Sequence, residues 1–200
     1  MAPWIESDDG PLLYQLLNRE SDERTKMGQL TEKLKALTVR ASSPDGLIDG
    51  TLHAWEETVE ISFQNDSYDS DYTEQALSHQ LSRLLDLLAV GRLRGRAQAA
   101  VETGWRKRDF SKPHWDKQQR DFEEAALDAE TIGASSNERI CLVSVAMRTF
   151  TVTVKSGTLD ELDEQEFCSE FASAVKDLIS DWQIVTSELR KHYLPDEHQF

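Results

Sequence analysis

The chain repeats itself once, and this repeat constrains its fold more than any other feature. The alternating segment Val59–Phe63 (VEISF) matches Phe150–Val154 (FTVTV) at an offset of 91 residues. The segment Thr73–Leu77 (TEQAL) matches Asp163–Phe167 (DEQEF) at an offset of 90 residues. One residue less in a loop reconciles the two offsets. The order of elements, their lengths and the positions of the helix caps therefore indicate a duplicated unit.

The first unit reads as helix, turn, strand, strand and helix. Apolar residues recur at three- and four-residue steps from Leu12 to about Leu37, which predicts a helix that packs along another helix. The segment Ser42–Gly46 (SSPDG) predicts a turn, because Pro sets φ and Asp-Gly tolerates positive φ. Residues 47–54 and 58–63 are expected to form two strands of a sheet that has one solvent-exposed face. Thr73 is the expected N-cap of the closing helix.

The second unit follows the same order. A helix is expected over 122–129, before the turn cluster Ile132–Asn137 (IGASSN). Residues 140–146 and 149–154 predict two strands, the second with apolar residues alternating with threonines. Asp163 is the expected N-cap of the helix that follows. Both closing helices are preceded by segments that we interpret as polar loops.

The segments Ser43–Ala54 (SPDGLIDGTLHA) and Thr58–Phe63 (TVEISF) resemble the YbaB/EbfC family. The resemblance covers residues 12–100 well, whereas residues 116–195 are similar by pattern and lack the Asp-Gly turn. It implies an α-β-β-β-α unit with an antiparallel sheet that dimerises. It also implies DNA binding of the nucleoid-associated type, although some relatives encoded beside type VII secretion systems are thought to be accessory proteins.

Two tandem copies of such a unit resemble a family dimer fused into one polypeptide. We therefore expect an α+β fold built from two tandem YbaB-like α-β-β(-β)-α halves, with antiparallel sheets flanked by helices. The expected boundaries are 1–104 for the first half, 105–118 for a basic, aromatic connector, and 119–200 for the more divergent second half. Each sheet is expected to bury its alternating apolar residues against its own helices.

Charge is distributed unevenly along the chain. The formal net charge is −15, which normally argues against polyanion binding. Between Arg92 and Arg120, however, nine basic residues stand against three acids, so this window is +6 and the remainder is −21. The window also contains aromatic residues, which can stack on bases or enter a groove. The candidate nucleic-acid-binding residues are Arg92, Arg94, Arg96, Trp105, Arg106, Lys107, Arg108, Lys112 and Trp115. The alternative is a solvated linker between acidic halves.

No pattern in the sequence indicates catalysis, a cofactor or a metal site. Cys141 and Cys168 form no C-x-x-C pair, and the five histidines show no i,i+4 pairing. There is no Walker A loop and no G-x-G-x-x-G motif. No apolar run approaches the length of a membrane span, and the N-terminus lacks the pattern of a signal peptide. We therefore expect a non-enzymatic, cytoplasmic protein without cofactors.

Two functional hypotheses follow from these features. The first is a nucleoid-associated-type protein that contacts DNA through residues 92–120 with limited sequence specificity. The alternative is a protein–protein adaptor that binds no DNA, such as a type VII secretion accessory protein. An adaptor would use its acidic faces or the long N-terminal helix as a docking face for a partner helix. An oligomer is compatible with either hypothesis.

Overall fold

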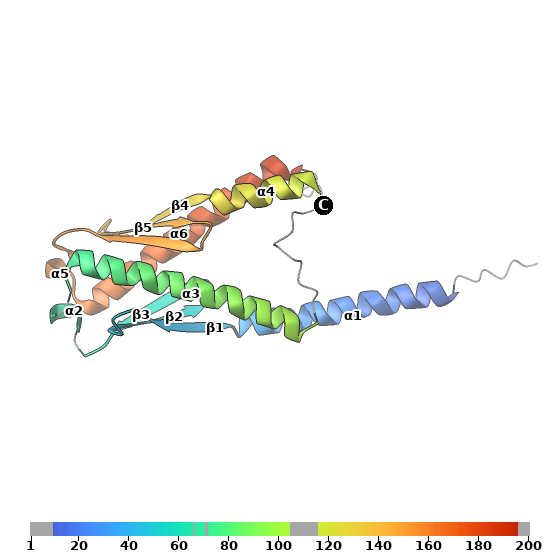
Figure 1. Cartoon of the computed structure of the whole chain (residues 1–200), viewed down its shortest axis with the longest axis horizontal. Helices are drawn as coiled ribbons and strands as arrows, with labels where there is room; N and C mark the ends of the chain where they lie inside the picture. Colours follow the sequence, from blue (N-terminus) through green and yellow to red (C-terminus); the bar gives the residue numbers. More distant parts are fainter. Residues whose placement is uncertain (1–9, 66, 71, 105–115, 196–200) are drawn as a thin grey trace, which may run out of the picture.

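The computed structural model describes residues 10–65, 67–70, 72–104 and 116–195. It is an α+β fold in which one order of elements occurs twice (Figure 1). The first half consists of α1 (Gly10–Lys35), β1 (Thr38–Ser42), β2 (Ile48–His53), β3 (Thr58–Phe63), α2 (Ser67–Ser70) and α3 (Glu74–Glu102). The second half consists of α4 (Lys117–Asp128), β4 (Glu130–Ala134), β5 (Ile140–Val145), β6 (Thr149–Val154), α5 (Thr158–Glu161) and α6 (Glu164–Tyr193).

Each half contains a three-stranded antiparallel meander, in the order β1-β2-β3 and β4-β5-β6. In the first sheet, for example, Gly50 of the central strand pairs with Ala41 of β1 and with Ile61 of β3. The central strands β2 and β5 alternate between buried and partly exposed residues, because successive side chains point to opposite faces. One face of each sheet therefore faces the core.

The N-termini of the two long helices confirm the predicted caps. The Thr73 side chain accepts a hydrogen bond from the backbone N–H of Ala76 at the start of α3. At the start of α6, Asp163 and Glu166 form a reciprocal capping box. Such caps satisfy backbone donors that have no partner within the helix.

The internal repeat is clearest in the buried residues of α3 and α6. Six buried positions of α3 correspond to six buried positions of α6 at an offset of 90 residues. The pairs are Leu77/Phe167, Leu81/Phe171, Leu84/Ala174, Leu85/Val175, Leu88/Leu178 and Ala89/Ile179. This offset makes it possible to compare any position of one helix with its equivalent in the other.

The two halves share one hydrophobic core. Each long helix packs on its own sheet and also on the sheet of the other half, so that α3 lies against β6 and α6 lies against β3. Aromatic rings join the halves near the starts of the two helices. The ring of Phe63 lies 5.1 Å from that of Tyr68 and 6.0 Å from that of Phe167, and the Tyr68 hydroxyl donates to the Leu162 carbonyl at 2.9 Å. The sheets thus pack against helices of both halves, rather than only their own.

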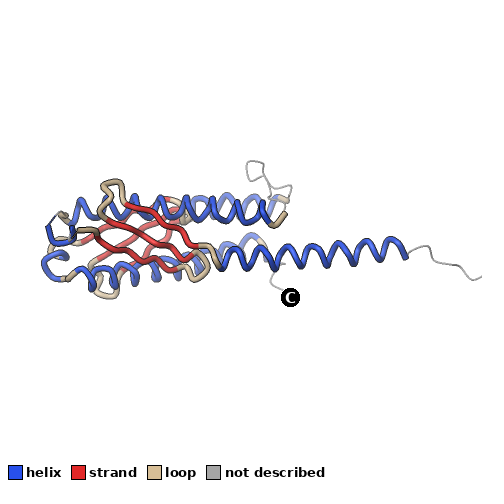
Figure 2. The backbone as a smooth tube through the Cα atoms, turned by 90° about the horizontal axis from the view of Figure 1, so that it is seen from below, coloured by secondary structure: helices blue, strands red, loops and turns tan. Residues whose placement is uncertain are grey.

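The helix α1 extends beyond the rest of the molecule. Its C-terminal part packs on the end of α3, where Lys33 forms an ion pair with Glu102 and Lys26 lies beside Gly104. Residues 10–25 continue past the end of α3, as Figures 1 and 2 both show, which corresponds to about 24 Å of helix. In the second half, α4 packs on α6 in the equivalent way but is shorter.

The structure differs from the sequence-based expectations in three places. Each half has three strands, although the sequence pattern predicts two. The strand β4 includes Ile132–Ala134, a segment for which the sequence predicts a turn. The additional strands β1 and β4 are only five residues long, and apolar and polar residues alternate weakly along them. The two-residue period of a strand is therefore hard to detect in the sequence. Single-turn helices α2 and α5 occupy the expected loops. None of the described helices is long and apolar enough to cross a membrane.

Candidate interaction surfaces

Three of the nine candidate nucleic-acid-binding residues lie in the described part of the chain. Arg92, Arg94 and Arg96 all lie on the C-terminal half of α3. Arg94 and Arg96 are exposed, and neither forms an ion pair with another described residue. The remaining candidates lie outside the described residues: Trp105, Arg106, Lys107, Arg108, Lys112 and Trp115.

Arg92 is used inside the protein. Its side chain is only 15% exposed, and its guanidinium lies 3.7 Å from the carboxylate of Glu57 in the β2–β3 turn. Burial lowers the pKa of Arg92 below its usual value, with a further contribution from the nearby charge of Arg96. Arg92 and Glu57 border an otherwise apolar cavity of about 40 Å³ between the two halves. The arrangement ties α3 to the first sheet and leaves Arg92 poorly placed for a phosphate.

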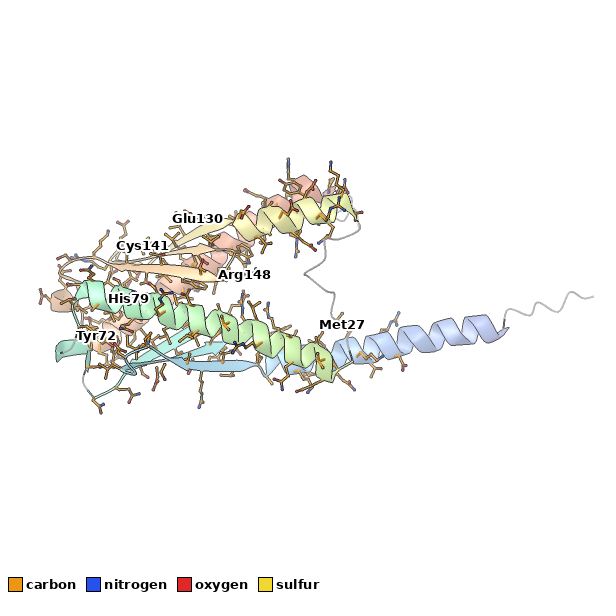
Figure 3. The ribbon with its side chains drawn as sticks, in the orientation of Figure 1. Met27, Tyr72, His79, Glu130, Cys141 and Arg148 are labelled. Atoms are coloured by element: carbon orange, nitrogen blue, oxygen red, sulfur yellow. The ribbon has the colours of Figure 1, made fainter. Side chains whose placement is uncertain are left out.

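An apolar stripe lies on the outer face of α3. Val90, Leu93 and Val101 are 41%, 47% and 69% exposed, and Ala97 is partly exposed between them. At about 100° per residue, the four positions fall within a sector of about 80° on the side of the helix opposite its buried residues. We call these four residues the α3 stripe. In Figure 3, Met27 of α1, which is 46% exposed, lies near the end of α3.

The outer edge of β6 is capped by side chains of α3. Backbone N–H groups of Phe150, Val152 and Val154 donate to Asp86 Oδ1, Ser82 Oγ and Ser78 Oγ at 2.8–2.9 Å. The N–H of Gly157 donates to Glu74 at 2.8 Å. The match is geometric, because four residues of helix and two residues of strand both advance by about 6–7 Å. A polar side chain at every fourth helix position therefore meets every outward N–H of the strand.

The outer edge of β4 is capped in the same manner by carboxylates of α6. The N–H of Ile132 donates to Asp181 at 2.9 Å, and that of Ala134 donates to Asp177 at 3.0 Å. Beyond the strand, Glu170 accepts from the N–H of Asn137 and from the Ser136 hydroxyl. Both edges of the second sheet thus donate hydrogen bonds to side chains of the long helices.

The free cysteines and the residues that could ligate a metal are further reactive groups in the described part of the chain. Burial raises the pKa of the Cys168 thiol to about 11, with a contribution from Glu164, so the thiol is protonated at neutral pH. Figure 3 shows Cys141 on β5 and His79 on α3. No group of three or more described His, Cys, Asp or Glu residues is placed to hold a metal ion.

Asp45 organises the β1–β2 turn that the sequence singled out. Its carboxylate accepts from the backbone N–H of Leu47 at 3.1 Å and from the Tyr72 hydroxyl at 2.8 Å. Partial burial acts to raise the pKa of Asp45, but these hydrogen bonds and one from Ser43 outweigh it, so the pKa lies below its ordinary value. The Asp-Gly turn is therefore structural.

The sequence analysis missed the edge-capping residues. Ser78 and Ser82 stand among ordinary polar positions of a helix, and Asp177 and Asp181 read as surface charges. The only available signal is their four-residue spacing, which any solvated helix face shows. Comparisons with known proteins do not supply further functional residues: no family model matches the chain, and neither the curated proteins nor the solved structures contain a significant match.

Proposed function

We propose that this protein is a tandem YbaB/EbfC-like pseudo-dimer that acts as a non-enzymatic adaptor between proteins. The family assignment is supported by the Asp-Gly turn, by the α-β-β-β-α order in each half, and by the correspondence of buried residues between α3 and α6 at an offset of 90 residues. The proposal of an adaptor function rests on a single observation, the exposed α3 stripe of Val90, Leu93, Ala97 and Val101.

The α3 stripe has the spacing of a helix-binding face. Apolar side chains at i, i+3, i+7 and i+11 form a continuous ridge, and an amphipathic helix of a partner can pack along it. Contiguous exposed apolar surface of this kind marks interaction sites in proteins that otherwise keep a charged surface. The projecting part of α1 supports the same function, because an isolated helix of that length is marginally stable in water and gains stability by packing on a partner.

Affinity purification with mass spectrometry tests the adaptor function. The tagged protein and the variant Leu93→Glu/Val101→Glu are purified from cells that express the protein. The control variant Gln75→Glu/Gln165→Glu adds the same two charges at exposed helix positions outside the stripe. We expect partners that the wild type and the control retain and the stripe variant loses. Recovery of the same proteins by all three would contradict the proposal.

DNA contact is the second candidate function, and the charge asymmetry favours it. Arg94 and Arg96 are exposed on α3 and form no ion pair with a described residue, and the window from Arg92 to Arg120 in which they lie carries a charge of +6. Phosphate contacts made by such residues release counterions, so the affinity would fall steeply with salt. The acidic remainder, at −21, limits the contact to this part of the molecule.

Fluorescence anisotropy of a labelled DNA duplex separates the two candidates. The protein is titrated at low and at near-physiological salt, together with the variant Arg94→Ser/Arg96→Ser/Arg106→Ser/Arg108→Ser. Salt-dependent binding that the variant loses would establish DNA contact. No binding at low salt would exclude it and leave the adaptor function as the remaining proposal.

A further inference from the structure

The outward face of α3 carries a longer pattern than the α3 stripe alone. In steps of four and three positions, the residues along this face are Arg83, Leu87, Val90, Arg94, Ala97 and Val101. At about 100° per residue, these positions fall within a sector of about 80°, opposite the buried residues of the helix. We call them the α3 seam. In Figure 1, α3 runs alongside the sheets and continues past them towards α1.

The spacing of the α3 seam is that of a coiled coil. A repeat of about 3.5 residues keeps one line of side chains facing a second helix, whose own side chains fill the gaps between them. Leu87, Val90 and Val101 are 47%, 41% and 69% exposed, and the side chain of Arg83 is 59% exposed. From Arg83 to Val101 the seam spans about 27 Å. It is therefore long enough for a partner helix of about five turns.

The internal repeat shows that the fold does not require apolar residues on this face. The 90-residue offset pairs the apolar seam residues of α3 with polar residues of α6, namely Leu87/Asp177, Val90/Ser180, Ala97/Ser187 and Val101/Lys191. Ala97 and Ser187 are both partly exposed, and the members of the other three pairs are all exposed. The same fold thus accepts polar side chains at equally exposed places of α6. Packing within the protein does not explain the apolar seam, which indicates contact with another chain.

Arg94 interrupts the apolar part of the seam. It lies between Val90 and Ala97, it is exposed, and it forms no ion pair with a described residue. Its equivalent in α6 is Ile184, so the charge is specific to α3. A helix that covered the seam would remove water from Arg94, and a charge that is removed from water needs an opposite charge.

We propose that the α3 seam binds a partner helix whose apolar face is interrupted by one carboxylate, placed opposite Arg94. The apolar residues of that helix would pack on Leu87, Val90 and Val101, and its Asp or Glu would accept hydrogen bonds from the Arg94 guanidinium. A single polar residue in such a seam sets the register and selects the partner at some cost in stability. The inference deepens the adaptor function and rests on it, because the seam and the α3 stripe share three residues.

The position of Arg94 also disfavours a second copy of the chain as the occupant. In a parallel pair of α3 seams, the two Arg94 side chains would face each other. In an antiparallel pair centred on the seam, each Arg94 would face a Val90. Neither arrangement supplies a carboxylate, whereas a partner helix with Asp or Glu at that place does.

Two synthetic peptides test the inference on the intact protein. Each is a labelled helical peptide of three heptads with Leu at the apolar positions, except that the central apolar position carries Glu in one peptide and Lys in the other. Fluorescence anisotropy measures binding at peptide concentrations at which sedimentation shows a monomeric peptide. We expect the wild-type protein to bind the Glu peptide at least tenfold more tightly than the Lys peptide.

Charge reversal provides the matched comparison. In Arg94→Glu the preference should reverse, so that the Lys peptide binds more tightly. Arg96→Glu makes the same change at an exposed position of the same helix outside the seam, and it should keep the wild-type preference. The variant Val90→Ser/Ala97→Ser/Val101→Lys carries the α6 residues into α3. It should bind both peptides at least tenfold more weakly while its melting temperature stays close to that of the wild type.

Three kinds of result would overturn the inference. Equal affinities of the wild type for the two peptides, or the same loss of preference in Arg94→Glu and Arg96→Glu, would show that Arg94 does not select the partner, and would leave the adaptor function in place. Failure of both peptides to bind would exclude a helix as the occupant, and the adaptor function would then be judged separately by affinity purification. A dimer that Val90→Ser/Ala97→Ser/Val101→Lys converts to a monomer in sedimentation would identify a second copy as the occupant.

Discussion

The cap on the β6 edge allows one substitution to be analysed quantitatively. The Ser82 hydroxyl accepts from the N–H of Val152 at 2.8 Å, and Val152 is only 3% exposed. Ser82→Ala removes the acceptor and leaves a buried donor without a partner, because water has little access to this site. A buried donor left unsatisfied costs about 1–3 kcal/mol, and a chain of this size loses about 2–4 °C of melting temperature per kcal/mol. We therefore expect a fall of about 4–8 °C for a loss of about 2 kcal/mol.

Ser180→Ala is the matched control for this prediction. Ser82 and Ser180 both donate to the carbonyl four residues earlier in their helix, but only Ser82 also accepts from a strand. The change in helix propensity is therefore the same in both variants. Calorimetry gives the two melting temperatures, and hydrogen exchange should show faster exchange of the Val152 amide in Ser82→Ala alone. Equal melting temperatures for the two variants would refute the reasoning about edge capping.

Three further predictions follow from the packing and the turns. Gly133→Ala should destabilise the protein strongly, because a Cβ there would collide with the backbone of α6, whereas Gly28→Ala, with open space around it, should be neutral or slightly stabilising; thermal melts compare the two. Phe63→Asp should unfold the protein, since it buries a charge in the aromatic cluster, and a wild-type circular dichroism melt would contradict this. The lowered pKa of Asp45 means that its carboxylate stabilises the fold at neutral pH and that this contribution is lost as the pH falls through the folded-state value. The stability difference between the wild type and Asp45→Asn should therefore narrow below about pH 4 in urea titrations, and a constant difference would contradict the assignment.

The placement of Arg92 illustrates a limit of reading charge from sequence. Arg92, Arg94 and Arg96 are the same residue type and lie within five consecutive residues, so the sequence groups them as one basic cluster. The structure separates them, because helical geometry turns Arg92 towards Glu57 and the cavity while Arg94 remains exposed. Side-chain direction relative to a neighbouring element decides which charges can meet a ligand.

Local patterns in the sequence were sufficient for the parts of the fold that depend on near neighbours. The strands around residues 47–63 and 140–154, the caps at Thr73 and Asp163, and the repeat itself all follow from periodicities and spacings within a short window. These features arise because side chains two, three or four residues apart share a face or a turn.

The tertiary structure alone decided which helix satisfies which strand edge. Ser78 and Ser82 meet backbone groups 76 and 70 residues away in the sequence, and a backbone N–H has the same chemistry whatever residue carries it. No sequence pattern can therefore pair the two. The same reason hides a difference between the two halves, because Leu87 of α3 is the equivalent of Asp177 of α6, which caps the N–H of Ala134.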